Sequence, residues 1–173
     1  LTGYECNKVE YQRVMESLDK QNIETIYDLL LDTLIKQGVV FFGGFANFMY
    51  NKQLEKRYRK SFNKVPDFDV LSENPKMSAD LLKGVLKENG VKKVKIVKHE
   101  ELGEIIAAHY EIRIGDETVC MIYEPLECHS YNDIILNKPR VKIASIDTIL
   151  SFYLAFLYSD RPYYDDDRIL CMC

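Results

Sequence analysis

The 173-residue chain lacks the features that mark membrane-spanning, disordered and repetitive proteins. No apolar run reaches the ~20 residues that a membrane-spanning helix needs. Glycine and proline number only 8 and 5, while 47% of the residues are apolar, a composition typical of a domain with a packed core. Low-complexity tracts and internal repeats are also missing. The sequence therefore predicts one globular domain, or one domain with a short extension.

The five cysteines lack the spacing of a metal site. They are Cys6, Cys120, Cys128, Cys171 and Cys173. No C-x-x-C pair with a matching partner pair is present, and Cys171 and Cys173 are too close together for a usual zinc knuckle. We expect free thiols in a reducing compartment.

Neither sign of charge dominates the chain, since its net charge is −4. Whole-chain electrostatics therefore give no indication of nucleic acid. Two local basic runs stand out, one from Lys52 to Lys64 and one from Lys92 to Lys98. Such runs are usually solvated faces, and they become informative only where a phosphate site lies nearby.

Apolar periodicity alternates between helical and strand spacing along the chain. Helices are predicted over 9–36, 45–60, 75–89 and 143–158, and strands over 39–42, 67–71, 91–98, 105–114 and 118–123. This order favours an α/β or α+β arrangement. We expect the α+β class, with a small mixed sheet flanked by helices.

Two short motifs indicate chemistry. Asp67 and Asp69 are two residues apart on a predicted strand, so both carboxylates project from one face and can share hard divalent cations. Gly43 and Gly44 lie between a strand and a helix, where bare backbone N–H groups can bind phosphate. Each motif alone has a simpler interpretation, as a solvated strand face and as a turn. Together, in this order, they favour a nucleotide site.

Longer stretches share a resemblance to a known family. They are FGGFAN (42–47), PDFDVLS (66–72), IYEPLECHSYN (122–132), IASIDTILSFYLAFLY (143–158) and RPYY (161–164). The glycine pair and D-x-D motif resemble the polymerase-β-like nucleotidyltransferase superfamily. More closely, these stretches resemble the poly(A) polymerase catalytic subunits of large cytoplasmic DNA viruses, of the asfarvirus and giant-virus type. The resemblance extends from about residue 38 to the end.

The resemblance implies template-independent transfer of AMP from ATP to an RNA 3′ end, as in mRNA polyadenylation. Asp67 and Asp69 would then bind Mg²⁺ or Mn²⁺, and Gly43, Gly44 and Asn47 would bind the nucleotide. It also implies ATP and the RNA 3′ end as partners, with a homodimer or further domains of the same polypeptide, and no membrane. The host cytoplasm or the virion is the expected location.

A third catalytic carboxylate is expected from the resemblance, on a strand beside the D-x-D strand. A simple hairpin arrangement places Cys120 or Met121 at that position, and neither is an acid. Glu124 shares the face of Cys120 further along the strand and is preferred as the third catalytic residue. Glu111, on the paired strand, is the alternative.

The expected organisation has three parts: an N-terminal helical segment (1–37), a nucleotidyltransferase core (38–142) and a C-terminal helical segment (143–173) that begins a further domain. The chain does not begin with Met and stops inside an apolar pattern, so we expect a piece of a longer protein. Two other functions stay open. One is a non-catalytic subunit of the same fold that acts as a binding or dimerisation module. The other is a nucleotidyltransferase that acts on a protein or a small molecule.

Overall fold

The computed structural model describes residues 20–51, 67–135, 139–159 and 166–173. In chain order the elements are α1 (Lys20–Gln37), β1 (Val40–Phe42), α2 (Gly43–Asn51), β2 (Phe68–Leu71), α3 (Pro75–Glu88), β3 (Val94–His99), β4 (His109–Ile114), β5 (Glu117–Tyr123), β6 (Tyr131–Ile135), β7 (Arg140–Ala144), α4 (Ile146–Ser159) and α5 (Asp166–Met172). The predicted core strands and the helix over 75–89 are confirmed, with shifts of a few residues at their ends. The predicted helix over 45–60 is confirmed as far as Asn51, and residues 52–60 lie outside the described ranges.

The strands form a single sheet in the order β3-β4-β5-β2-β1-β7-β6. The pairs β1–β7 and β2–β5 are parallel, and the other neighbours are antiparallel. The expected α+β class with a mixed sheet is therefore confirmed. The sheet is larger than expected, because β6 and β7 were not predicted as strands.

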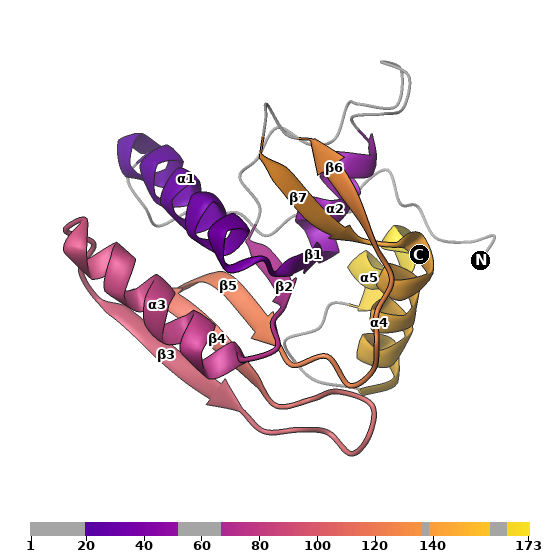
Figure 1. Ribbon diagram of the computed structural model, residues 1–173. Coiled ribbons are helices and arrows are strands. Elements are labelled where there is room, and N and C mark those ends of the chain that lie inside the picture. Colours follow the sequence, from indigo (N-terminus) through magenta and orange to yellow (C-terminus); the bar gives the residue numbers. More distant parts are fainter. Residues whose placement is uncertain (1–19, 52–66, 136–138, 160–165) are drawn as a thin grey trace.

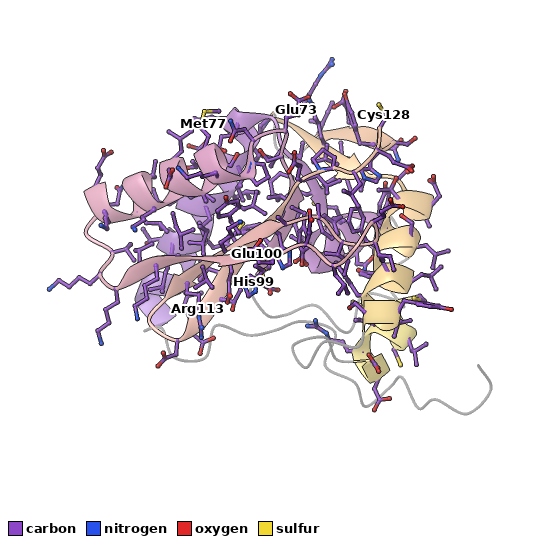
Figure 2. All side chains as sticks on the ribbon, turned by 90° about the horizontal axis from the view of Figure 1, so that it is seen from below. Glu73, Met77, His99, Glu100, Arg113 and Cys128 are labelled. Carbon is purple, nitrogen blue, oxygen red and sulfur yellow. The ribbon has the colours of Figure 1, made fainter. Side chains whose placement is uncertain are left out.

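Helices cover the sheet from two sides. In Figure 1, α1 and α3 lie together over one side, while α4 and α5 lie together on the other. In Figure 2, Met77 of α3 lies on one side of the sheet, and His99 and Arg113 of the strands β3 and β4 lie toward the other. Ring contacts confirm the layers. Tyr27 of α1 stacks on Phe68 with ring centroids 4.9 Å apart, and Phe152 of α4 stacks on Phe42 at 4.6 Å.

Helix boundaries follow from local chemistry. The helix α1 stops before Gly38, whose φ of +69° suits glycine at a helix end. The helix α3 begins after Asn74, whose side chain accepts a bond from the Met77 N–H at 3.1 Å, with Pro75 in the first turn. Gly90 follows its end with a φ of +82°. These signals fix α3 where the sequence predicted it.

The segment between β5 and α4 differs from the predicted elements. Tyr131 and Asn132 begin β6, a strand that was not predicted. Ile143 was expected to begin the last long helix, but Ile143 and Ala144 end β7 and the helix begins at Ile146.

Some predictions fall outside the described residues: the helical pattern over 9–19, the basic run 52–64 and the RPYY stretch at 161–164. The expected three-part division stays a prediction, although β7 crosses its boundary at residue 142. Within the described ranges, none of the helices has the length and apolarity to cross a bilayer.

Candidate active site

The carboxylate of Asp69 lies directly against Gly43. Phe42 is the register partner of Asp69 between the antiparallel strands β1 and β2, so the chain enters α2 beside that carboxylate. A Cβ at Gly43 would overlap Asp69 Oδ2 and lie 2.9 Å from the Asp69 Cβ, and Gly43 has a φ of +62°. Both the space and the backbone conformation require glycine here. The predicted meeting of Asp69 with the glycine pair is thus present in the fold.

Asp67 lies two residues before Asp69, and both side chains are half-buried. Their common neighbour is the fully buried thiol of Cys120, which stands opposite Phe68 on the parallel strand β5. Burial raises the pKa of this thiol well above its ordinary value, and the negative charges of Asp69 and Asp67 raise it further. The negative charges of Asp67 and Asp69 therefore both act on the Cys120 thiol, beside the start of β2.

A single row of residues crosses the sheet at the level of Asp69. Phe42, Asp69, Met121 and Glu111 are successive register partners on β1, β2, β5 and β4. Met121 thus occupies the neighbouring-strand position where a third acid was sought. Glu111 lies one strand further away, about 10 Å from Asp69 between Cα atoms at the usual strand spacing.

Glu124 does not lie beside the two aspartates. Because β2 and β5 are parallel and Asp69 pairs with Met121, Glu124 is three residues further toward the opposite end of β2, roughly 10 Å along the strand direction. Its side chain is exposed. Across the described ranges, no group of three His, Cys, Asp or Glu side chains could hold a metal ion.

Glu111 has partners of its own. Its carboxylate accepts hydrogen bonds from Thr118 and from His99 Nε2, the latter at 2.8 Å, and Arg113 Nε lies 3.5 Å away. Burial alone would raise the pKa of Glu111, but the bonds from Thr118 and His99 and the charge of Arg113 outweigh it, so the pKa is lowered. Glu111 is therefore a structural acid on the face that also holds Asp69.

Glu111→Ala is expected to lower the free energy of unfolding at pH 7 by about 1–3 kcal/mol, because the partly buried donors Thr118 and His99 lose their acceptor. A lowered folded-state pKa means that the carboxylate stabilises the fold above pH 4.5, its ordinary pKa, and that this contribution disappears as pH falls through the folded-state value. Urea unfolding at pH 7 and pH 3 measures the difference, with exposed Glu104→Ala as the control. A difference from wild type that is equally large at both pH values would contradict the assignment.

Asn47 and Tyr153 join α2 to α4 beside this site. Asn47 lies one helical turn after Gly43, and its Nδ2 donates to the Tyr153 hydroxyl at 2.8 Å. Tyr153 is buried, and its pKa is raised by burial and next by the negative charge of Asp69. Tyr153 is not among the site residues that the sequence indicated. A buried tyrosine hydroxyl needs a partner, and this was the signal that could have connected it to the site.

The carboxylates of Asp67 and Asp69 suit a divalent cation. Mg²⁺ is commonly held by one or two carboxylates and completes its coordination with water and substrate phosphates. Asp69 lies against the start of α2 and Asp67 is two residues before it, so the pair meets that description beside a helix N-terminus, where a phosphate can bind. Gly44 follows Gly43 in the first turn of α2 and is partly exposed, so its backbone can approach a ligand.

The cysteines differ in part from expectation. Cys120, Cys128 and Cys173 are free, as predicted. The prediction of a free thiol is wrong for Cys171, which is disulfide-bonded.

Comparisons with known proteins support the fold. No protein-family model matches the sequence, and no curated protein matches it. Among solved structures, the chain is similar to the Megavirus polyadenylate synthase with a TM-score of 0.63 at 16% sequence identity. The match covers 91% of this chain and 32% of that one, so the chain spans about a third of the length of that protein. At this identity the likeness shows that this chain shares the fold of part of a viral polyadenylate synthase.

Proposed function

We propose that this chain has a nucleotidyltransferase fold and transfers AMP from ATP to an RNA 3′ end in a template-independent, metal-dependent reaction. The single observation that supports it most is the packing of the Asp69 carboxylate on Gly43 at the start of α2. This contact joins a candidate metal ligand to a candidate phosphate site. The shared fold with a viral polyadenylate synthase adds support.

The residues of this site would have different roles, which follow from their positions. The first N–H groups of α2, at Gly43 and Gly44, are ones that a helix leaves without intrahelical partners, and they would donate to a phosphate bound at the helix N-terminus. Asp67 and Asp69 would hold Mg²⁺ or Mn²⁺, which when bound neutralises charge on the triphosphate and on the leaving pyrophosphate. Asn47 and Tyr153 hold α4 against α2 and so keep the nucleotide side of the site in one geometry. Binding the triphosphate and the acceptor in line accounts for most of the catalysis in such transfers.

Primer extension tests the proposal. The purified chain is incubated with Mn²⁺, labelled ATP and an oligo(A) primer, and AMP addition is followed on a gel. We expect a ladder of extended primers that disappears with EDTA. A reaction that labels added protein or small-molecule acceptors, and leaves the RNA primer unextended, would contradict RNA as the acceptor.

A second candidate is a non-catalytic subunit of the same fold, which acts as a binding or dimerisation module. One observation favours it: Met121 occupies the position beside Asp69 where a third acid would lie. Within the described part of the chain, no third acid forms a metal-binding group with Asp67 and Asp69. This candidate predicts that ATP binds with Mn²⁺ and that no primer is extended. Extension by the wild-type protein eliminates it.

A further inference from the structure

A cavity of about 300 Å³ lies between α2, α4 and α5, next to the candidate active site. Its lining includes Asn47, Tyr50, Ile149, Leu150, Tyr153 and Met172. Two of these residues connect it to the site. Asn47 is four residues after Gly43 on the same helix, about 6 Å along the axis, and Tyr153 lies close enough to Asp69 for that charge to act on its hydroxyl. Its volume is at the lower end of the ~300–1,000 Å³ typical of ligand pockets.

The lining combines apolar and polar side chains. Ile149, Leu150 and Met172 supply apolar contact. Tyr50 already donates its hydroxyl to the Ala144 carbonyl at 2.8 Å, so it serves mainly as a fixed wall.

The amide of Asn47 has hydrogen-bonding capacity beyond its partner. Its bond to Tyr153 uses one amide hydrogen, and an asparagine side chain offers a second amide hydrogen and a carbonyl oxygen. Asn47, whose amide is held by Tyr153, lines a cavity that also has apolar side chains in its lining. Such a combination suits a planar heterocycle whose edge has both a donor and an acceptor.

We infer that this cavity binds the adenine base of the nucleotide, with the Asn47 amide pairing with the edge of the base. Asparagine matches the exocyclic amine and adjacent ring nitrogen of adenine and does not match the corresponding edge of guanine. A triphosphate at the N-terminus of α2 would leave the ribose to bridge one turn of the helix to Asn47. The inference rests on the proposed function, because it assigns the base of a nucleotide whose phosphates lie at Gly43.

Two leucines on α4 provide a matched pair of variants. Leu150 lines the cavity and is 40% exposed, whereas Leu154 is one turn further on and 52% exposed. A tryptophan at position 150 fills the cavity, and a tryptophan at position 154 adds the same bulk outside it. Titration calorimetry with Mn²⁺ measures the affinity of each variant for two probes, ATP and inorganic tripolyphosphate. The second probe has the phosphates without the base.

We expect Leu150→Trp to weaken ATP binding about tenfold or more and to leave tripolyphosphate binding unchanged. Leu154→Trp should bind both probes as the wild type does. Equal ATP affinity in the wild type and Leu150→Trp would overturn the base site and leave the phosphate site intact. A wild-type protein that binds neither probe would overturn the proposed function together with this inference.

Asn47→Ala provides a second readout that does not depend on bulk. It should lower the ratio of ATP affinity to GTP affinity by roughly tenfold, because the adenine-specific pairing is lost. An unchanged ratio would remove Asn47 from base recognition.

Discussion

Asp69→Asn is expected to reduce AMP incorporation into an oligo(A) primer by a factor on the order of 10³, since a metal-binding carboxylate contributes several kcal/mol to transition-state charge stabilisation. Asparagine retains the shape of aspartate, so the packing against Gly43 is kept and the negative charge is removed. Initial rates with labelled ATP and saturating Mn²⁺ measure the effect. Thermal unfolding of the variant shows that it is folded.

Glu124→Gln is the matched control for this substitution. It also removes one carboxylate, but Glu124 is exposed and three residues beyond the register partner of Asp69. Its rate should stay within about twofold of wild type, since surface substitutions away from a site usually have small effects. If Asp69→Asn retains the wild-type rate, Asp69 has no part in the reaction. If Glu124→Gln loses most of its rate, the assignment of the site to Asp67 and Asp69 alone is wrong.

Gly43→Ala should lower the free energy of unfolding by about 2–5 kcal/mol. A non-glycine residue at positive φ costs about 1–2 kcal/mol, and an extra methyl in a filled site costs about 1–3 kcal/mol more. The new methyl would overlap Asp69 Oδ2, so the carboxylate must move and activity should fall as well. Urea denaturation and primer extension measure the two effects.

Alanine substitutions at two other glycines distinguish the cost of backbone strain from the cost of steric overlap with Asp69. Gly90 has a φ of +82°, and an added Cβ there would meet nothing within 4 Å, so Gly90→Ala measures the cost of strain alone. Gly84 lies in the middle of α3 with open space around it, and Gly84→Ala should stabilise the protein by roughly 0.5–1 kcal/mol. Gly43→Ala must be clearly the most destabilising of the three. A value equal to that of Gly90→Ala would mean that Asp69 does not crowd Gly43.

Local signals were sufficient for the part of the fold that builds the site. Capping by Asn74 and Pro75 and the stop at Gly90 set α3. Alternation around Asp69 predicted β2, and the apolar run before Gly43 predicted β1. Each of these signals acts over a few residues, so it can be recognised without knowing the tertiary structure.

Strand pairing could not be predicted in the same way. The sequence suggested a hairpin-like neighbour for the D-x-D strand, but β5 runs parallel to β2, and this direction decides where Glu124 lies. The choice between parallel and antiparallel neighbours depends on contacts about 50 residues apart in sequence, which no local pattern contains.

The end of β7 was missed for a different reason. Ile143 and Ala144 continue the apolar composition of α4, so periodicity alone joined them to the helix. Ser145 directly precedes the helix, and serine is a preferred residue at a helix N-terminus; its hydroxyl donates to the Thr148 hydroxyl at 3.1 Å. The strand β6 gave little signal, since four of its five residues are exposed and lack strict alternation.

The most direct test of the site is an anomalous-difference map from crystals that contain Mn²⁺ and a non-hydrolysable ATP analogue. We predict a manganese peak about 2–2.5 Å from carboxylate oxygens of Asp67 and Asp69, with analogue phosphates at the N–H groups of Gly43 and Gly44. A peak bound elsewhere, with no density at the two aspartates, would contradict the assignment of this site.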